Sequence, residues 1–293
     1  MRQVRAPAPL DHIQSATVDL PGIAIIGGGH MGRALVGGLV RRGVRPEHIR
    51  VGEASDVVRG ALERDFGIRT YADNAAAIAD ATVIVVAIRP QDSAVVLSRL
   101  APQLRTRQPL VVSVVAGIRI ASLSAWCGED LPIVRAMPNR PALLGAGATG
   151  IFAPERVSAA LRARAEMVMR SVGEVVWLRA EHEIDLVTAL SGSGPAYFFL
   201  LGEHMTQAAI GLGLEPATAR TLAVATLYGA GLLGHAEGDL ARLRAEVASQ
   251  GGTTEAAVRA FQSAGLEATV ASAMSAAARR ATELAEEFGT VQR

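Results

Sequence analysis

Two short stretches of the sequence place glycine where backbone amides can bind an anion. Near the N-terminus, "IIGGGHMGRAL" contains Gly27, Gly29 and Gly32 in the spacing G-x-G-x-x-G. Near the C-terminus, residues 249–254 read "SQGGTT". Adjacent glycines allow successive backbone N–H groups to converge on one anion, and the two threonines add hydroxyl donors. The sequence therefore contains two candidate anion-binding loops that are far apart along the chain.

The residue types that the chain lacks exclude several kinds of catalytic group and binding site. All 29 residues counted as lysine or arginine are arginine, so neither a lysine Schiff base nor a lysine acid is available. The single cysteine, Cys127, cannot form an intramolecular disulfide, which fits a reducing compartment. The histidines show no metal-ligand spacing, and we expect no metal. A formal charge of +1 with scattered arginines favours neither a nucleic-acid nor a membrane partner.

The N-terminal glycine triplet stands between an apolar run and a helical pattern, where it is typical of dinucleotide binding. Gly27 permits a tight turn, Gly29 lets backbone amides approach a pyrophosphate, and Gly32 allows close helix packing. The helix N-terminus would face the phosphate charge. An ordinary glycine turn is the alternative. His30 either contacts phosphate or serves as a spacer.

An acidic residue about 20 positions after such a loop normally binds the ribose 2′-hydroxyl and favours NAD. Glu53, in "VGEAS", is placed to do so. A 2′-phosphate would instead need an arginine or a hydroxyl, and Arg59 or Ser55 can supply one. The local sequence leaves the choice of cofactor open.

These loops need elements that position them. Short β-branched runs alternate with alanine-rich helical stretches from Gly22 to about Leu178. Strands are expected at 23–27, 49–52, 82–88, 110–115, 132–136 and 174–178, and helices at 31–42, 55–65 and 91–100. Continuous apolar strands separated by helices predict a parallel sheet covered on both faces, the doubly wound α/β pattern.

After about residue 180 the expected strands stop and helical stretches follow. We therefore predict an N-terminal extension at 1–21, a Rossmann-type NAD(P)-binding domain at 22–180 and an all-helical domain at 181–293. The extension lacks the run of about 7–15 apolar residues of a signal peptide, which favours the cytoplasm. The segment "YFFLLGEHMTQAAIGLGL" falls short of about 18 uninterrupted apolar residues and predicts a buried helix of a soluble protein.

Further motifs stand where the expected strands end, the edge at which open α/β sheets bind ligands. They are "AIRPQ" (87–91), "VVAGI" (114–118) and "VRAMPNRPAL" (134–143). Turn chemistry is the alternative for any one of them. Together with "IGGGHMG", "TALSGSGPAYFF" and "SQGGTT", in this order, they resemble the pyrroline-5-carboxylate reductase family. The resemblance covers the chain from about Gly22 to Glu287, and "ALSGSGPAY" and "GGTT" are its most specific parts.

The resemblance implies reduction of the C=N bond of L-1-pyrroline-5-carboxylate to L-proline, the last step of proline biosynthesis, with NADPH or NADH. A protonated cyclic imine accepts hydride readily, and solvent can provide the proton, which fits a chain without lysine. Catalysis would then rest mainly on proximity. The substrate carboxylate would bind at "SQGGTT", where adjacent amides and a helix N-terminus attract an anion. Helix capping by either threonine is the alternative there.

The family's site residues fall on positions in both halves of the chain. Thr254 matches the hydrogen-bond partner of the ring nitrogen and is the expected catalytic residue. The expected substrate-binding residues are Glu237, Ser249, Gly251, Gly252, Thr253 and Thr254, with a solvated helix-start carboxylate as the alternative for Glu237. The expected cofactor-binding residues are Gly27, Gly28, Gly29, His30, Met31, Gly32, Glu53, Ser55, Asn74, Ala87, Ile88, Arg89, Pro90, Ala116 and Gly117. Ser191 to Pro195 would shape the site together with the helical core.

Three positions depart from the family pattern. The family often has lysine at Arg89, threonine at Arg140 and proline at Gln250. Arg89 keeps the charge and Gln250 leaves both glycines intact, whereas the bulk of Arg140 alters the expected cofactor edge.

Two other functions compete with the reductase. The β-hydroxyacid dehydrogenases share a similar glycine loop and a helical second domain, but they use a lysine that this chain lacks. A sensor or scaffold that binds NAD(P) without turnover would have a disrupted substrate loop, whereas "GGTT" is intact. The apolar helical domain also predicts a homodimer, and the resemblance adds a pentamer of dimers as a further possibility. Feedback by proline is left open.

Overall fold

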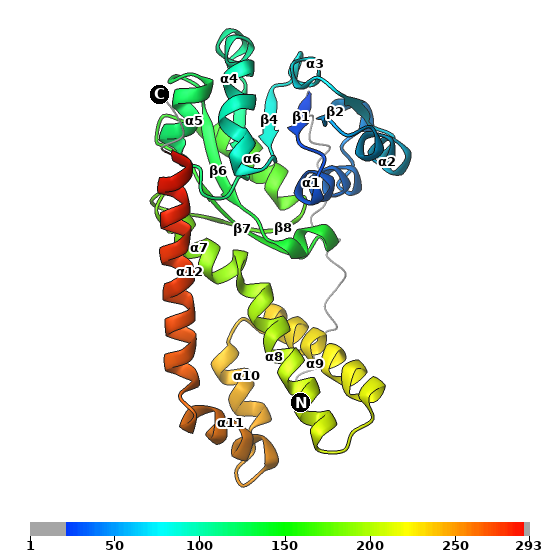
Figure 1. Cartoon of the computed structure of the whole chain (residues 1–293), viewed down its shortest axis with the longest axis vertical. Coiled ribbons are helices and arrows are strands. Elements are labelled where there is room, and N and C mark those ends of the chain that lie inside the picture. The colour runs from blue at the N-terminus through cyan, green and yellow to red at the C-terminus, as the bar shows by residue number, and fades with distance from the viewer. Residues whose placement is uncertain (1–21, 290–293) are drawn as a thin grey trace. The chain divides into compact units, whose positions relative to one another are not determined.

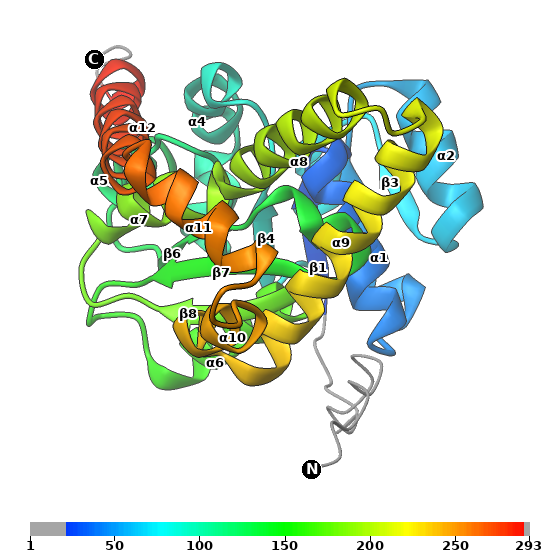
Figure 2. The same ribbon diagram turned by 90° about the horizontal axis from the view of Figure 1, so that it is seen from below.

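The computed structural model describes residues 22–289, so the expected extension at 1–21 lies outside the described residues. The chain divides into two compact units (Figures 1 and 2). Within the described residues, the first contains 22–193 together with 276–289 and is called the nucleotide unit here. The second contains 194–275 and is called the helical unit.

An eight-stranded sheet forms the centre of the nucleotide unit, in the order β3-β2-β1-β4-β5-β6-β7-β8. The strands are β1 Ile23–Ile26, β2 Ile49–Gly52, β3 Arg69–Tyr71, β4 Val83–Val86, β5 Leu110–Ser113, β6 Ile133–Met137, β7 Gly147–Phe152 and β8 Gly173–Trp177. All neighbouring strands pair in parallel except β6 and β7, which are antiparallel. The order reverses at β1 and β4, which creates the crevice where such sheets bind ligands.

Helices cover both faces of this sheet, as the unbroken apolar strands predict. The helices of the unit are α1 His30–Arg41, α2 Asp56–Phe66, α3 Asn74–Ile78, α4 Pro90–Arg107, α5 Ile120–Cys127, α6 Ala159–Arg170 and α7 Glu183–Val187. Short turns of helix, η1 Pro46–His48, η2 Arg140–Leu144 and the π-helical η3 Thr188–Gly192, complete it.

Alternate residues of the central strands β1, β4 and β5 enter two separate cores. Ile23 and Ile25 of β1 pack in a cluster with Leu35 of α1. Ala24 and Ile26 face the other way, into a cluster with Leu97 of α4. Cys127 is fully buried in this second cluster, and burial raises the pKa of its thiol to about 12. The doubly wound Rossmann-type fold is therefore confirmed.

The structure contains two strands that the sequence did not predict. Arg69–Tyr71 (β3) is a short, polar edge strand, so it carries no apolar run. Gly147–Phe152 (β7) reads "GATGIF", and its small residues have little strand preference. The expectation of a wholly parallel sheet is wrong at β7, which runs against β6.

The helical unit contains no strand among residues 194–275. Its helices are α8 Gly194–Gly211, α9 Pro216–Glu237, α10 Leu240–Val247 and α11 Thr253–Ser263, and α12 Leu266–Gly289 begins there. The compact units divide between Ser193 and Gly194, and the end of α12 belongs to the nucleotide unit. The domain boundary expected near residue 180 stays a prediction.

Helix α8 is not buried in the single chain, contrary to the expectation for its apolar segment. Only Gly194 of its residues is buried. Over the described residues, the continuous helix Glu183–Gly211 is long and apolar enough to cross a membrane by length and composition alone. Core helices of soluble proteins share these properties, so this is weak evidence for a membrane span.

Candidate active site

The glycine loop after β1 has the geometry that dinucleotide binding requires. Gly27 has a φ of +101°, and a Cβ there would lie 2.5 Å from the carbonyl oxygen of Ala87. A Cβ on Gly32 would lie 2.0 Å from the carbonyl oxygen of Gly27, so α1 can approach β1 only with glycine. Gly29, by contrast, faces open space with no atom within 4 Å of a built Cβ. Strand, loop and helix pack tightly while the loop's outer side stays accessible.

The N-terminus of α1 is free to receive an anion. Its N-cap is Gly29, which supplies no capping side chain, and the first turn contains no acidic residue. The first amides of a helix have no partner within it and carry partial positive charge. The residues present therefore fit the pyrophosphate of a dinucleotide.

Glu53 lies beside this loop and is held by backbone amides. One carboxylate oxygen accepts from Gly28 N at 2.8 Å, and the other accepts from Ser55 N at 2.9 Å. Arg59 donates to the carbonyl oxygens of Glu53 at 2.8 Å and Ala54 at 2.9 Å and forms an ion pair with Asp56. Ser55 caps α2 by accepting from Val58 N at 3.4 Å. A fixed negative charge therefore follows β2, with an arginine already engaged nearby.

The remaining expected cofactor residues lie at the ends of the neighbouring strands. Asn74 begins α3, and its amide oxygen lies 2.2 Å from where a Cβ on Gly52 would be. Ala87 N donates to the carbonyl oxygen of Ile26 at 2.8 Å, which joins the β1 and β4 ends. The Arg89 side chain is 81% exposed and pairs with Asp92 at 2.9 Å. Asn74 follows β3, and Ala87 and Arg89 follow β4, so these residues lie at the edge of the sheet where its strands end.

The turn after β5 packs against helix α12. Gly117 has a φ of +73°, and a Cβ there would lie 3.1 Å from the Phe288 ring and 3.4 Å from Leu284, both on α12. Ala116 precedes it and is half-buried. The glycine is thus required for packing as well as for the expected cofactor contact.

A hollow of about 250 Å³ opens next to the glycine loop. It is lined by His30, Met31, Pro138, Asn139, Arg140, Leu143 and Gly192. Arg140 is exposed at its edge, and the effect of its bulk on the cofactor site stays a prediction. The hollow brings the start of α1 together with the segment after β6 and the π-helical turn η3.

Asn139 is the residue of this hollow that the sequence-based assignment missed. It is buried, donates to the carbonyl oxygen of Ser191 at 2.9 Å and accepts from Ala148 N at 2.9 Å. It therefore joins the end of β6 to η3 and β7. Its position after a strand, within "RAMPN", was the available signal.

The "SQGGTT" segment forms the turn that enters α11. Gly251 has a φ of +72°. Gly252 is the N-cap of α11, and no side chain caps this helix end by a hydrogen bond. Gly252 N donates to the carbonyl oxygen of Ser249 at 3.0 Å, whereas Gly251 N donates to the Glu255 carboxylate at 2.6 Å. Glu255 also pairs with Arg259 at 2.9 Å. The chain's own carboxylate therefore occupies one amide of the expected anion nest, and the nest itself stays a prediction.

The threonines of this turn do not cap the helix. Thr253 and Thr254 are its first two residues, and among residues 22–289 neither hydroxyl makes a hydrogen bond. Thr253 is exposed and Thr254 is half-buried. The capping alternative is therefore wrong, and both hydroxyls are available to a ligand.

Glu237 is engaged in an ion pair. It is the last residue of α9 and pairs with Arg242, and this hydrogen bond raises the pKa of the arginine. Arg242 also pairs with Glu246 at 2.5 Å. The alternative of a helix-start carboxylate is wrong, because Glu237 ends its helix.

Two family sequence patterns match this chain. The pattern described as "Pyrroline-5-carboxylate reductase dimerisation" matches residues 181–284, and "NADP oxidoreductase coenzyme F420-dependent" matches 22–117. The chain is 46% identical over 270 residues to a pyrroline-5-carboxylate reductase of Pseudomonas aeruginosa, covering 92% of this chain and 98% of the relative.

Solved structures give the same match. A pyrroline-5-carboxylate reductase of Coxiella burnetii superposes with a TM-score of 0.87 at 38% identity, over 91% of this chain and 99% of that chain. The Plasmodium falciparum pyrroline carboxylate reductase with NADP bound has a TM-score of 0.78 at 24% identity, over 90% and 98%. The second likeness shows the fold alone.

Proposed function

Because the chain belongs to the pyrroline-5-carboxylate reductase family, we propose that its two glycine loops serve one reaction, reduction of L-1-pyrroline-5-carboxylate to L-proline. The protein is an NAD(P)H-dependent oxidoreductase of proline biosynthesis. The observation that supports this function best is that residues 22–289 leave two loops open to an anion, at the helix N-terminus beside Gly29 and at the Thr253 and Thr254 hydroxyls, which have no hydrogen-bond partner in this range.

The cofactor would be held by the nucleotide unit. The amides at the start of α1 bind the pyrophosphate, and the glycines keep side chains out of its path. When bound, the reduced nicotinamide supplies the hydride. The hollow lined by His30, Asn139 and Gly192 is the place we assign to the nicotinamide end. Asn139 keeps that hollow in shape through its bonds to Ser191 and Ala148.

The choice between NADPH and NADH depends, in our proposal, on Glu53. Its carboxylate binds the ribose hydroxyls of NADH, since each oxygen accepts only one backbone hydrogen bond and has a lone pair left. A 2′-phosphate would meet the same charge unfavourably. Arg59 offsets this only partly, because its donors are engaged with two carbonyl groups and Asp56. We propose that the protein accepts both cofactors and that Glu53 limits its use of NADPH.

The substrate would be held at the start of α11. Gly251 N is already bonded to Glu255, so the amides of Thr253 and Thr254 are the donors we assign to the substrate carboxylate. The Thr254 hydroxyl then orients the ring nitrogen. Solvent provides the proton that makes the imine an acceptor of hydride, so no acidic side chain is needed. The contribution of these residues is binding and orientation, which is a proximity effect.

The helical unit would complete its fold in an oligomer. The matched family pattern is a dimerisation pattern, and the unit exposes many large apolar side chains. We propose a homodimer in the cytoplasm, with a pentamer of dimers as the larger assembly that the family resemblance implies.

A direct assay tests the reaction. Purified protein supplied with NADPH or NADH should consume the reduced nicotinamide only after L-1-pyrroline-5-carboxylate is added, and L-proline should accumulate in equal amount. Tight cofactor binding without oxidation would support the sensor alternative and reject the reductase. Reduction of NAD(P)⁺ on addition of a β-hydroxyacid, together with no imine reduction, would support the dehydrogenase alternative.

A further inference from the structure

A partly buried charge cluster lies in the nucleotide unit, on residues not assigned to cofactor or substrate. Arg135 of β6 is only 2% exposed, and its guanidinium donates to a carboxylate oxygen of Glu181 at 2.8 Å. The same Glu181 oxygen accepts from Ile120 N at 2.7 Å. Glu181 therefore joins a central strand to the first residue of α5.

The cluster continues to helix α12. Arg119, the N-cap of α5, pairs with Asp185 of α7 at 3.4 Å. The Thr282 hydroxyl of α12 lies 3.3 Å from the same Asp185 oxygen and 3.3 Å from the carbonyl oxygen of Ala278, so its one hydrogen is shared between two acceptors. Two arginines and two carboxylates thus balance their charges. Burial lowers the pKa of Arg135 while Glu181 opposes that effect, so the arginine is retained at an energetic cost.

The segment that this cluster surrounds is the turn after β5. Strand β5 ends at Ser113 and α5 begins at Ile120, so Ala116 and Gly117 lie between them. Glu181 holds the far end of the turn at the Ile120 amide. Leu284 and Phe288 of α12 cover Gly117, and Thr282 binds α12 to the same cluster. The turn is therefore fixed at its end and across its surface.

We propose that Arg119, Arg135, Glu181, Asp185 and Thr282 fix the Ala116–Gly117 turn for cofactor binding, with Glu181 as the positioning residue. The inference rests on the proposed function, because it takes this turn as part of the cofactor site. A half-buried carboxylate that accepts from a backbone amide and from a buried arginine at once has two geometric constraints. Removing its charge would weaken its bonds to the buried arginine and to the amide that ends the turn, and small displacements of binding groups weaken a preorganised site.

The variant Glu181→Gln tests the proposal through a split in the kinetic constants. We expect KM and Kd for the reduced nicotinamide to rise about three- to tenfold, while KM for the imine stays within experimental error. The matched control is Glu166→Gln, because Glu166 also bonds an arginine, Arg170, and a ring N–H, from Trp177, in the same unit. The control should lower thermal stability without changing either KM.

A second, milder variant keeps the proposal testable if Glu181→Gln does not fold. Thr282→Val removes the hydroxyl bond to Asp185 without unpairing a buried charge, and cofactor KM should rise about twofold. If the wild-type protein reduces the imine but every soluble variant binds cofactor like the Glu166→Gln control, the positioning role is rejected. If the wild-type protein itself does not reduce the imine, the proposed function fails instead.

Discussion

Thr254 is the second residue of α11, half-buried, with a hydroxyl that bonds to nothing in the described part of the chain. If it orients the ring nitrogen, Thr254→Ala should lower kcat about tenfold, the effect of losing one hydrogen bond. Cofactor Kd should be unchanged, because the nucleotide unit is untouched. Steady-state kinetics and cofactor titration measure the two quantities.

Two further variants separate a catalytic from a structural effect at this position. Thr254→Ser keeps the hydroxyl and should restore most of the turnover. Thr269→Ala is the matched control, since Thr269 lies near the start of α12 and its hydroxyl donates to the carbonyl oxygen of Gly265 in its own helical turn. A wild-type rate for Thr254→Ala would remove Thr254 from the mechanism.

Glu53 offers a second prediction at the scale of one residue. Glu53→Gln keeps the shape of the side chain and removes its charge, so repulsion of a 2′-phosphate should disappear. The ratio of kcat/KM with NADPH to kcat/KM with NADH should rise about tenfold, equivalent to about 1.4 kcal/mol. Glu63→Gln removes a charge from α2 at a residue that bonds Thr70 and should leave the ratio unchanged. An unchanged ratio in both variants would assign the preference to other residues.

At the scale of elements, a helix, strand or loop could be predicted from the sequence when the interactions that form it act between residues close together in the chain. The loop from Gly27 to Gly32 was predicted correctly as a strand-to-helix turn because its requirement is steric and acts between near neighbours. The helices after β1, β2 and β4 were predicted within a few residues except at the end of α4. Strands β3 and β7 were missed because their pairing partners, and not their own residues, make them strands.

In the candidate site, too, features set by nearby residues differ from features set by distant ones. Asn139 was missed because its partners Ser191 and Ala148 come from distant segments. The bond from Gly251 N to Glu255 was missed although its signal is local, an acidic residue at the third position of a helix. Long-range packing explains the first omission, and the second was readable from the sequence.

Helix α1 supports a prediction that distinguishes packing from cofactor binding. Gly32→Ala would place a Cβ 2.0 Å from the Gly27 carbonyl oxygen, so α1 must move. Both thermal stability and cofactor affinity should fall, the latter by more than about tenfold. Gly29→Ala meets no atom, so stability should be kept while cofactor affinity falls.

Gly60→Ala is the control for both glycine variants. It lies inside α2, its added Cβ meets no atom within 4 Å, and alanine favours a helix by about 1 kcal/mol. Stability should rise slightly with no change in cofactor Kd. Normal cofactor binding by Gly29→Ala would show that the open space at the loop is not used by the dinucleotide.

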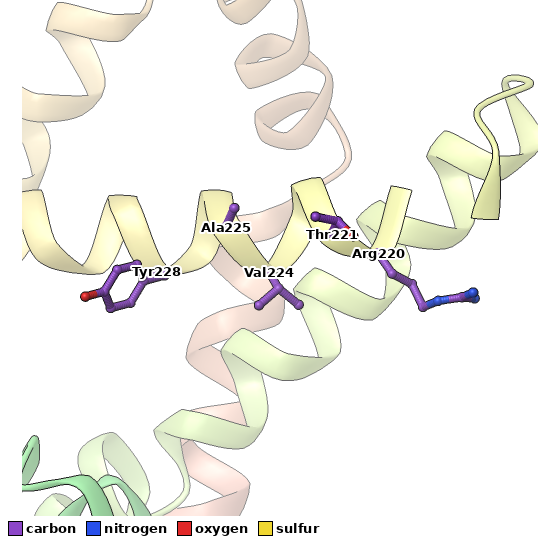
Figure 3. A pocket seen from close by; sticks show the side chains of 5 residues that line it. All are labelled: Arg220, Thr221, Val224, Ala225 and Tyr228. Carbon is purple, nitrogen blue, oxygen red and sulfur yellow. The ribbon is translucent and has the colours of Figure 1, made fainter. Parts of the chain in front are cut away.

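At the scale of the whole molecule, the helical unit leaves an apolar surface that a single chain does not cover. Figure 3 shows Arg220, Val224 and Tyr228 projecting from the same side of α9, and Val224 and Tyr228 are both 68% exposed. Soluble monomers rarely expose large apolar side chains in such number on one unit. Other large apolar side chains exposed in this unit are Phe198, Phe199, Leu200, Leu201, Met205, Leu212, Leu214, Leu222, Leu233, Leu240, Val247, Phe261, Leu266 and Val270.

Val224→Arg therefore tests whether a second copy covers this surface. Burying an unpaired charge in an apolar interface is unfavourable, so the variant should shift the population toward monomers at micromolar concentration. Light scattering after size separation measures the mass. Val57→Arg is the control, because Val57 is 83% exposed on α2 of the nucleotide unit and should leave the mass unchanged. A wild-type chain that is monomeric under these conditions would contradict the homodimer, and equal masses for both variants would place the interface elsewhere on the helical unit.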